Sequence, residues 1–172
     1  MTKTQEILRQ RAEQISQKST LKVSSERMIE VLEFNISDET YCMETSHLLE
    51  VHKDFSIVRI PTAPSFVMGI FNRRGKITTV VDLRVLFKIP HTTRSDKGIL
   101  IVIADEDKEF AIWADSIGAV RYITESSISS ELPTLSTYPI DYVIGIDSNK
   151  KIILNAKKII NDPNLVVNEQ VI

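Results

Sequence analysis

Several features that would place this 172-residue chain outside the cell or in a membrane are missing or scarce. It has one cysteine, Cys42, so no disulfide forms within the chain, and an intracellular environment is favoured. No apolar run approaches the length of a membrane span, and the stretch from Met1 to Met28 lacks the apolar core of a signal peptide. We therefore expect a soluble, cytoplasmic protein with no segment inserted in the membrane.

Charge and aromatic content both argue against nucleic-acid binding. The formal net charge is −2, which provides no positive field to attract a phosphate backbone. Aromatic residues make up 6% of the chain and do not alternate with basic residues, as a stacking platform for single strands requires. An oligonucleotide-binding barrel is therefore disfavoured, although the strand pattern alone leaves it open.

The sequence also lacks the local signatures of catalysis and of metal binding. Its five glycines are dispersed, and neither a nucleophile elbow nor a phosphate-binding loop is present. His47 and His52 are five residues apart, a spacing that suits neither one face of a zinc-binding helix nor one face of a strand. Even with Glu50 between them, surface histidines beside a carboxylate are the commoner arrangement. We expect no catalytic residue, no cofactor and no metal.

Other reactive or unusual residues have ordinary structural interpretations. Cys42 lies between Tyr41 and Met43 in an apolar run, which favours a buried, inert thiol. The acidic pairs at positions 38–39 and 105–106 fall on expected hairpin turns, where solvated carboxylates are a better interpretation than an acid and base pair. Trp113 is expected to pack on a strand face, with a partner-facing role left open.

The chain divides into an extension, a β-rich domain and a tail. Residues 1–27 are polar and weakly basic, with Leu8, Ala12 and Ile15 on one helical face, so this extension is expected to be helical or mobile. From residue 28 to residue 163, short runs rich in Val, Ile and aromatics alternate with polar turns, which predicts hairpins. Residues 164–172 are expected to form a mobile tail.

The β-rich domain contains an internal duplication. Val143-Ile144-Gly145-Ile146 repeats the form of Val67-Met68-Gly69-Ile70, and each run is followed by a polar turn and a Lys-Ile pair. A single small β unit exposes strand edges and an apolar face, which two related units can cover together. We therefore predict two similar lobes with a shared core, at roughly residues 28–90 and 97–160. Short helices are expected after Asp82 and after the helix-capping Asn155.

One long motif resembles a known family. The run from Pro61 to Arg84 reads PTAPSFVMGIFNRRGKITTVVDLR, and it resembles the central signature of the CheW family in its proline placement, its glycine turn and its Asp-Leu-Arg ending. The likeness extends over about residues 28–163, through the stretch at 34–51, the run at 112–117 and the closing segment at 142–160.

The resemblance implies a fold, an activity class and partners. The implied fold is mainly β, with two five-stranded β-barrel lobes similar to Src-homology-3 domains. The domain has no active site in this family. The resemblance therefore implies a non-enzymatic adaptor that couples the cytoplasmic tip of a chemoreceptor to the regulatory domain of a CheA-type histidine kinase in chemotaxis. A cytoplasmic protein recruited to membrane-associated receptor arrays is therefore expected; a generic β-barrel binding module or a small barrel enzyme is the alternative.

The resemblance also implies site residues. By position, the receptor-binding residues are Leu48, Glu50, Asn72, Arg74 and Gly75. Asn72 and Gly75 are expected to shape the hairpin turn that presents Arg74. Asp82 and Arg84 are expected to support the fold. An alternative for Glu50 and Arg74 is that they form ion pairs with each other or with neighbours in the same domain.

Three positions depart from the usual family pattern. Arg73 stands where the family generally has an aliphatic residue, Thr79 where proline is common, and Asn155 where aspartate is frequent. Asn155 still caps a helix. Arg73 adds a cation beside Arg74, and it leaves open whether the partner is an ordinary chemotaxis receptor or a divergent one that serves surface motility or another output.

Overall fold

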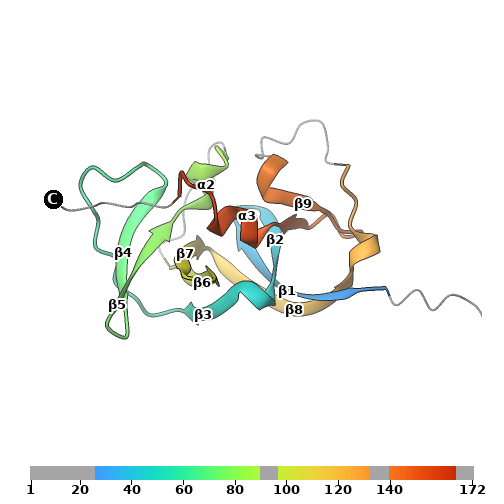
Figure 1. Cartoon of the computed structure of the whole chain (residues 1–172), viewed down its shortest axis with the longest axis horizontal. Coiled ribbons are helices and arrows are strands. Elements are labelled where there is room, and N and C mark those ends of the chain that lie inside the picture. Colours follow the sequence, from blue (N-terminus) through green and yellow to red (C-terminus); the bar gives the residue numbers. More distant parts are fainter. Residues whose placement is uncertain (1–25, 90–96, 132–139, 166–172) are drawn as a thin grey trace, which may run out of the picture.

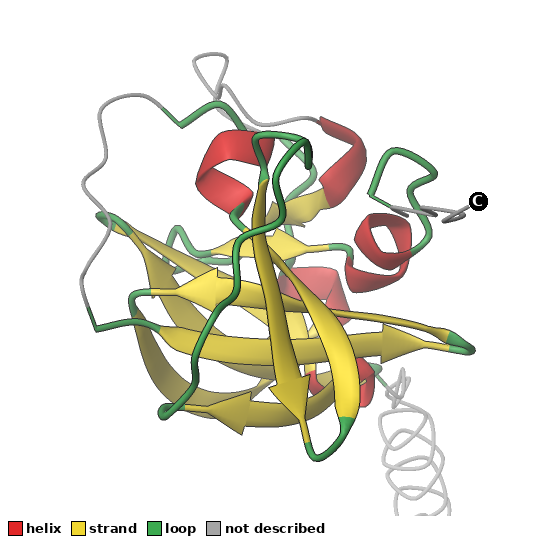
Figure 2. Ribbon diagram, turned by 90° about the vertical axis from the view of Figure 1, so that its left-hand side faces the viewer, coloured by secondary structure: helices red, strands yellow, loops and turns green. Residues whose placement is uncertain are grey.

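Short β-strands make up most of the structure, a computed structural model that describes residues 26–89, 97–131 and 140–165 (Figures 1 and 2). The strands are β1 (Met28–Ile36), β2 (Glu39–Glu44), β3 (Leu48–His52), β4 (Val67–Arg73), β5 (Lys76–Val81), β6 (Ile99–Asp105), β7 (Lys108–Ala114), β8 (Ser116–Thr124), β9 (Val143–Ile146) and β10 (Ile152–Leu154). The helices are α2 (Leu83–Leu86) and α3 (Ala156–Ile160), with 3₁₀ turns η1 (Thr45–His47), η2 (Glu125–Ser127) and η3 (Ile140–Tyr142). Among the described residues, no helix has the length and apolarity needed to cross a membrane.

The strands form two five-stranded sheets that exchange strands between the two halves of the chain. One sheet has the order β8-β1-β2-β10-β9 and the other the order β3-β6-β7-β5-β4. Each sheet therefore joins strands from both halves. The expected mainly β class with two five-stranded units is confirmed, but over the described residues the units are five-stranded sheets whose end strands do not pair to close a barrel. The expected division into lobes at 28–90 and 97–160 is wrong, because β3 pairs with β6 and β8 pairs with β1.

The duplication seen in the sequence corresponds to a structural repeat. Counted from the start of each half, the strand orders of the two sheets are the same, and each sheet contains one parallel pair: β5 with β7, and β10 with β2. Each half also contains an isolated bridge: Val58 pairs with Ile70, and Ser129 pairs with Ile146. The repeat was predictable because the same pattern occurs twice. The exchange was not, because alternation defines the faces of a strand and not its neighbour.

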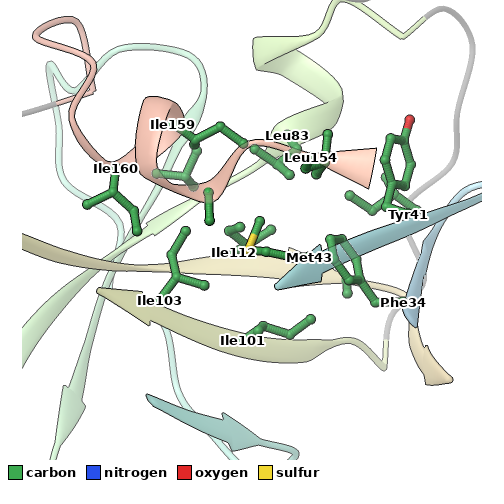
Figure 3. Close-up of a cluster of buried hydrophobic side chains, with 14 of the residues drawn as sticks. Phe34, Tyr41, Met43, Leu83, Ile101, Ile103, Ile112, Leu154, Ile159 and Ile160 are labelled. Carbon is green, nitrogen blue, oxygen red and sulfur yellow. The ribbon is translucent and has the colours of Figure 1, made fainter. Parts of the chain in front are cut away.

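The two sheets share one large core. Apolar residues from both sheets and from α2 and α3 pack together there, among them the fully buried Phe34, Tyr41, Met43, Leu83, Ile101, Ile103, Ile112, Leu154 and Ile159 (Figure 3). Two smaller clusters are separate from it, one on Phe71 and Trp113 in the sheet of β4 and the other on Val31 and Cys42 in the sheet of β1. Trp113 packs on a strand face, as expected.

Capping residues position the two short helices. The Asp82 side chain accepts a hydrogen bond from the backbone N–H of Arg84 at 2.9 Å, and the Asn155 side chain accepts one from the N–H of Lys158 at 3.0 Å. Both caps satisfy a backbone donor that has no partner inside its helix. The Arg84 side chain is 4% exposed and pairs with Asp82 and with Asp115. Asp82 and Arg84 therefore support the fold, as expected.

Some expectations about the connections and ends need correction or lie outside the described residues. Between β2 and β3 the chain forms the 3₁₀ turn Thr45–His47, and Glu50 lies in β3. Leu165 falls in the expected tail, yet it is buried in the shared core. The extension up to residue 25 and the tail from residue 166 lie outside the described residues.

Candidate docking site

The β4–β5 hairpin has the turn that its sequence predicts. Arg74 and Gly75 both have positive φ, at 50° and 88°, and the Asn72 Oδ1 atom accepts a hydrogen bond from the Gly75 N–H at 2.7 Å. A positive φ costs glycine little because it has no Cβ atom. Asn72 and Gly75 therefore shape the turn that presents Arg74. In Figure 1 this hairpin lies at one end of the molecule, with β9 toward the other end.

Arg74 is much more exposed than Glu50, the other charged residue of the expected site. Its side chain is 85% exposed, and its nearest carboxylate oxygen is Oε1 of Glu50, at 3.9 Å. Such a long contact between exposed groups contributes little to stability. The guanidinium is therefore hydrated and accessible to a partner.

Strand β3 lies at the edge of its sheet and has two different faces. Leu48 is partly buried and packs against the shared core, whereas Leu49 is 50% exposed and Val51 is 40% exposed. On this strand the exposed apolar area is therefore provided by Leu49 and Val51, whereas Leu48 contributes to the core. Sequence reasoning missed Leu49 and Val51, although their alternation with Glu50 was a usable signal.

Ile77 is a further exposed apolar residue of the hairpin. It is 59% exposed and lies opposite Asn72 in the register of β4 and β5. A single exposed aliphatic side chain is common on protein surfaces, but Ile77 lies on the same hairpin as the solvated Arg74, so this hairpin offers both apolar and charged groups. Ile77 was not identified from the sequence because the Lys-Ile pair was assigned only to the repeat.

Arg73 links the hairpin to two other strands. Its Nη1 atom donates to the Glu50 carboxylate on β3 at 3.1 Å, and its Nη2 atom donates to both Glu109 oxygens on β7 at 3.0 Å. Glu109 also contacts the Lys76 ammonium at 2.7 Å and accepts from the Thr78 hydroxyl at 3.2 Å. The side chains of Arg73 and Glu109 are only 13% and 12% exposed. Arg73 is thus an internal ion-pair partner.

The ion pairs alter the acidity of both carboxyls. Partial burial by itself would raise the pKa of Glu50, but the charges of Arg74 and Arg73 outweigh it, so this pKa lies below its usual value. Burial opposes the shift at Glu109 too, and hydrogen bonds from Lys76 and Arg73 lower its pKa. Both carboxyls are therefore ionised at neutral pH. The expected alternative of ion pairs within the domain applies to Glu50, which is hydrogen-bonded to Arg73 at 3.1 Å and forms a longer ion pair with Arg74 at 3.9 Å.

The histidines considered as possible metal ligands lie in different contacts. His52 Nε2 is 2.9 Å from Glu50 Oε2, and the His52 ring packs edge-on against Phe71. His47 Nδ1 is 3.9 Å from an oxygen of Asp105. Over residues 26–89, 97–131 and 140–165, no group of three or more His, Cys, Asp and Glu side chains is arranged to hold a metal ion.

Cys42 has the environment of an unreactive thiol. It is 1% exposed and contributes to the small cluster in the sheet of β1. Burial, with the negative charge of Glu33 nearby, raises the pKa of this thiol to about 12. At neutral pH it carries almost no thiolate, so it is a poor nucleophile.

A cavity of about 460 Å³ lies beside α2, away from the hairpin turn. Its lining includes Arg59, Ser65 and the Asp82 carboxylate. The Oδ1 atom of Asp82 already accepts from the backbone and side chain of Arg84. The described lining therefore offers no histidine or cysteine, and its single carboxylate is engaged in the fold.

Comparison with protein families identifies one model over nearly the whole β-rich region. The model of the CheW-like domain matches residues 30–164. This range agrees with the 28–163 over which the sequence resembles that family, and it includes the signature run and both sheets.

Curated relatives have the same name in several bacteria. The chain is 25% identical to "Chemotaxis protein CheW" of Helicobacter pylori over 138 residues, which cover 79% of this chain and 84% of that protein. It is 23% identical to "Chemotaxis protein CheW" of Treponema pallidum over 126 residues, covering 71% of this chain and 74% of that protein.

A solved structure has the same fold. The scaffolding protein TtCheW from Thermoanaerobacter tengcongensis superimposes with a TM-score of 0.65 and 31% sequence identity, covering 74% of this chain and 88% of that one. The two chains therefore share their architecture over most of their lengths.

Proposed function

The chain belongs to the family of CheW-like domains, and from this premise we propose that it is a chemotaxis adaptor that couples a chemoreceptor to a CheA-type histidine kinase. Its mechanism is the joining of two proteins in a defined geometry, without bond making. The similarity to TtCheW, which is described as a scaffolding protein, supports this function. A non-enzymatic role is consistent with the cavity lining and with the inert Cys42 thiol.

The proposed receptor-binding surface consists of β3 and the β4–β5 hairpin. Arg74 supplies the most exposed charge of this surface, and Asn72 and Gly75 stabilise the turn on which Arg74 lies. Glu50 lies beneath this charge, bonded to Arg73. Leu48 supports β3 from the core side, and Leu49, Val51 and Ile77 supply exposed apolar area. We name these eight residues the hairpin surface: Leu48, Leu49, Glu50, Val51, Asn72, Arg74, Gly75 and Ile77.

One observation carries this assignment: Arg74 is 85% exposed at a turn whose conformation Asn72 and Gly75 define. The defined turn fixes the backbone position of Arg74, so little backbone entropy is lost when a partner binds there. The partner is proposed to be the cytoplasmic tip of a chemoreceptor, an α-helical hairpin. The kinase regulatory domain is proposed to bind elsewhere on the molecule, and recruitment to membrane-associated receptor arrays follows from receptor binding.

The test compares two exposed arginines. Arg74→Ala is expected to weaken binding to a receptor tip by about 2 to 5 kcal/mol if the contact is desolvated in the complex, with little change in melting temperature. Arg121→Ala is the matched control, because Arg121 is 52% exposed on β8 of the other sheet, where its Nε atom contacts Glu33 at 2.8 Å. Binding is measured by calorimetry with a soluble receptor-tip fragment from the same organism.

Unchanged binding in Arg74→Ala, or equal losses in both variants, contradicts the proposed surface. A parent protein that binds neither the receptor tip nor the kinase regulatory domain contradicts the adaptor function itself.

A further inference from the structure

The hairpin surface and the groups directly below it carry more positive than negative charge. Three cations, on Arg73, Arg74 and Lys76, are in contact with two carboxylates, on Glu50 and Glu109. A charged partner responds to the sum of nearby charges as well as to the closest one, because partly buried charges are weakly screened. The approaching partner therefore meets a net positive surface.

Arg73 supplies the third cation, which makes the net charge positive. Burying its guanidinium would be unfavourable without carboxylate partners. The guanidinium is only 13% exposed, and its Nε atom is buried with no hydrogen-bond partner among the described residues. A cation in such a place is tolerated only when carboxylates compensate for its lost hydration. Glu50 and Glu109 provide that compensation through three hydrogen bonds of 3.0 to 3.1 Å.

The same contacts occupy Glu50. One of its oxygens accepts from Arg73 at 3.1 Å, and the other lies 2.9 Å from His52 Nε2. The carboxylate keeps 27% exposure, and both arginines offset its charge, with the Arg73 guanidinium at 3.1 Å and the Arg74 guanidinium at 3.9 Å. Glu50 therefore offers no uncompensated negative charge to a partner, and its hydrogen-bonded ion pair is with Arg73 and not with Arg74.

From this geometry we infer that Arg73 is a specificity-determining residue: by compensating Glu50, it leaves Arg74 as the charge that a partner meets, so the hairpin surface selects a helix with a carboxylate opposite Arg74 and disfavours one with lysine or arginine there. This inference rests on the proposed function and adds the chemistry of the partner. In the absence of Arg73, Glu50 is free to close the distance to Arg74 and to reduce the charge available to that carboxylate.

Three variants separate the charge of Arg73 from a structural role. Arg73→Leu removes the charge, Arg73→Lys keeps it without the forked geometry, and Arg73→Leu combined with Glu50→Gln removes both members of the pair. In all three, Glu109 retains Lys76 and Thr78 as partners. The probe is the fluorescently labelled receptor-tip fragment from the same organism, together with a version whose exposed tip glutamates are replaced by glutamine. Affinity is measured by anisotropy at about 50 mM and about 300 mM salt.

The parent should bind the natural fragment more weakly at the higher salt concentration and bind the glutamine version poorly. Arg73→Leu should weaken binding of the natural fragment about five- to tenfold. Arg73→Lys should weaken it less, and the double variant should bind more tightly than Arg73→Leu. A purely structural role predicts instead that the double variant is as weak as Arg73→Leu.

The inference is overturned if Arg73→Leu binds as the parent does, if Glu50→Gln does not restore its binding, or if the glutamine fragment binds normally. If Arg73→Leu melts well below the parent, the series is repeated in a Glu109→Gln background, which removes the buried carboxylate that lost a partner. Failure of the parent to bind any receptor tip would instead contradict the proposed function, so the two failures are distinguishable.

Discussion

The two sheets follow the same strand plan but differ in one hairpin. In the sheet that contains β3, strands β4 and β5 have seven and six residues, whereas the equivalent β9 and β10 have four and three. The exposed Arg74, the apolar Ile77 and the Arg73 ion pairs all belong to the longer hairpin. The two sheets therefore share the strand order that defines the fold, and the candidate docking surface lies on the hairpin that is longer in one of them.

The internal contacts of the repeat are closely similar in the two sheets. Gly69 lies where an added Cβ atom would come within 2.2 Å of the Val58 carbonyl oxygen, and Gly145 lies where it would come within 2.3 Å of the Ser129 oxygen. Both glycines allow the chain to form its isolated bridge at that point. Because both sheets have this contact, it is a feature of the repeated fold and is not specific to the candidate docking surface.

The first prediction tests whether the two bridges are equivalent, and it has the largest expected effect. Gly69→Ala should destabilise the fold by roughly 3 kcal/mol and Gly145→Ala by roughly 2 kcal/mol, because each added methyl overlaps backbone atoms that cannot easily move. The Gly69 substitution should cost more, because its φ of 144° adds backbone strain. Urea unfolding measures both values. A cost near zero at either position would show that the bridge is not a rigid part of the plan.

The second prediction concerns the Arg74–Gly75 turn of the longer hairpin. Gly75→Val should cost roughly 1 to 3 kcal/mol through strain alone, because φ is 88° and no atom lies within 4 Å of the added Cβ. Gly75→Ala serves as the control with less branching and should cost less. Thermal unfolding measures both variants, and a Gly75→Val protein that melts with the parent would contradict the strained conformation.

The third prediction uses the acidity of the Glu109 network and has the smallest effect. The folded-state pKa of Glu109 is lowered, so its contribution to stability is complete above its unfolded value of 4.5 and is lost as the pH falls through the folded value. Glu109→Gln should therefore reduce the loss of unfolding free energy between about pH 7 and about pH 3.5, by an amount on the order of 1 kcal/mol.

Chemical denaturation at the two pH values measures this difference. A variant that loses as much stability in acid as the parent would show that the Arg73 and Lys76 contacts of Glu109 do not persist in solution.

Much of the hairpin could be predicted from the sequence because its determinants are local. Gly75 and Asn72 lie three residues apart, and their turn follows from the positive φ that glycine tolerates. The caps at Asp82 and Asn155 bond to atoms two and three residues away. The order of elements in the duplication could likewise be followed along the chain, and the family signature is a continuous run.

The remaining features depend on residues that are far apart in the sequence. Arg73 bonds to groups 23 and 36 positions away, and nothing near it in the sequence indicates that a second arginine at a turn would be buried between two carboxylates. Leu48 faces the core and Leu49 faces solvent because β3 pairs with β6, with a shift of register between Leu48 and Glu50.

The sequence by itself thus determined the strands, the turns, the caps and the family of this protein, since each depends on neighbouring residues or on a continuous pattern. Only the tertiary structure decided which strands became neighbours, and with them the exchange between the halves, the outward face of β3 and the compensation of Glu50 by Arg73. The physical reason is that a strand's alternation specifies two faces, whereas its partner and register are selected by the burial of the shared core.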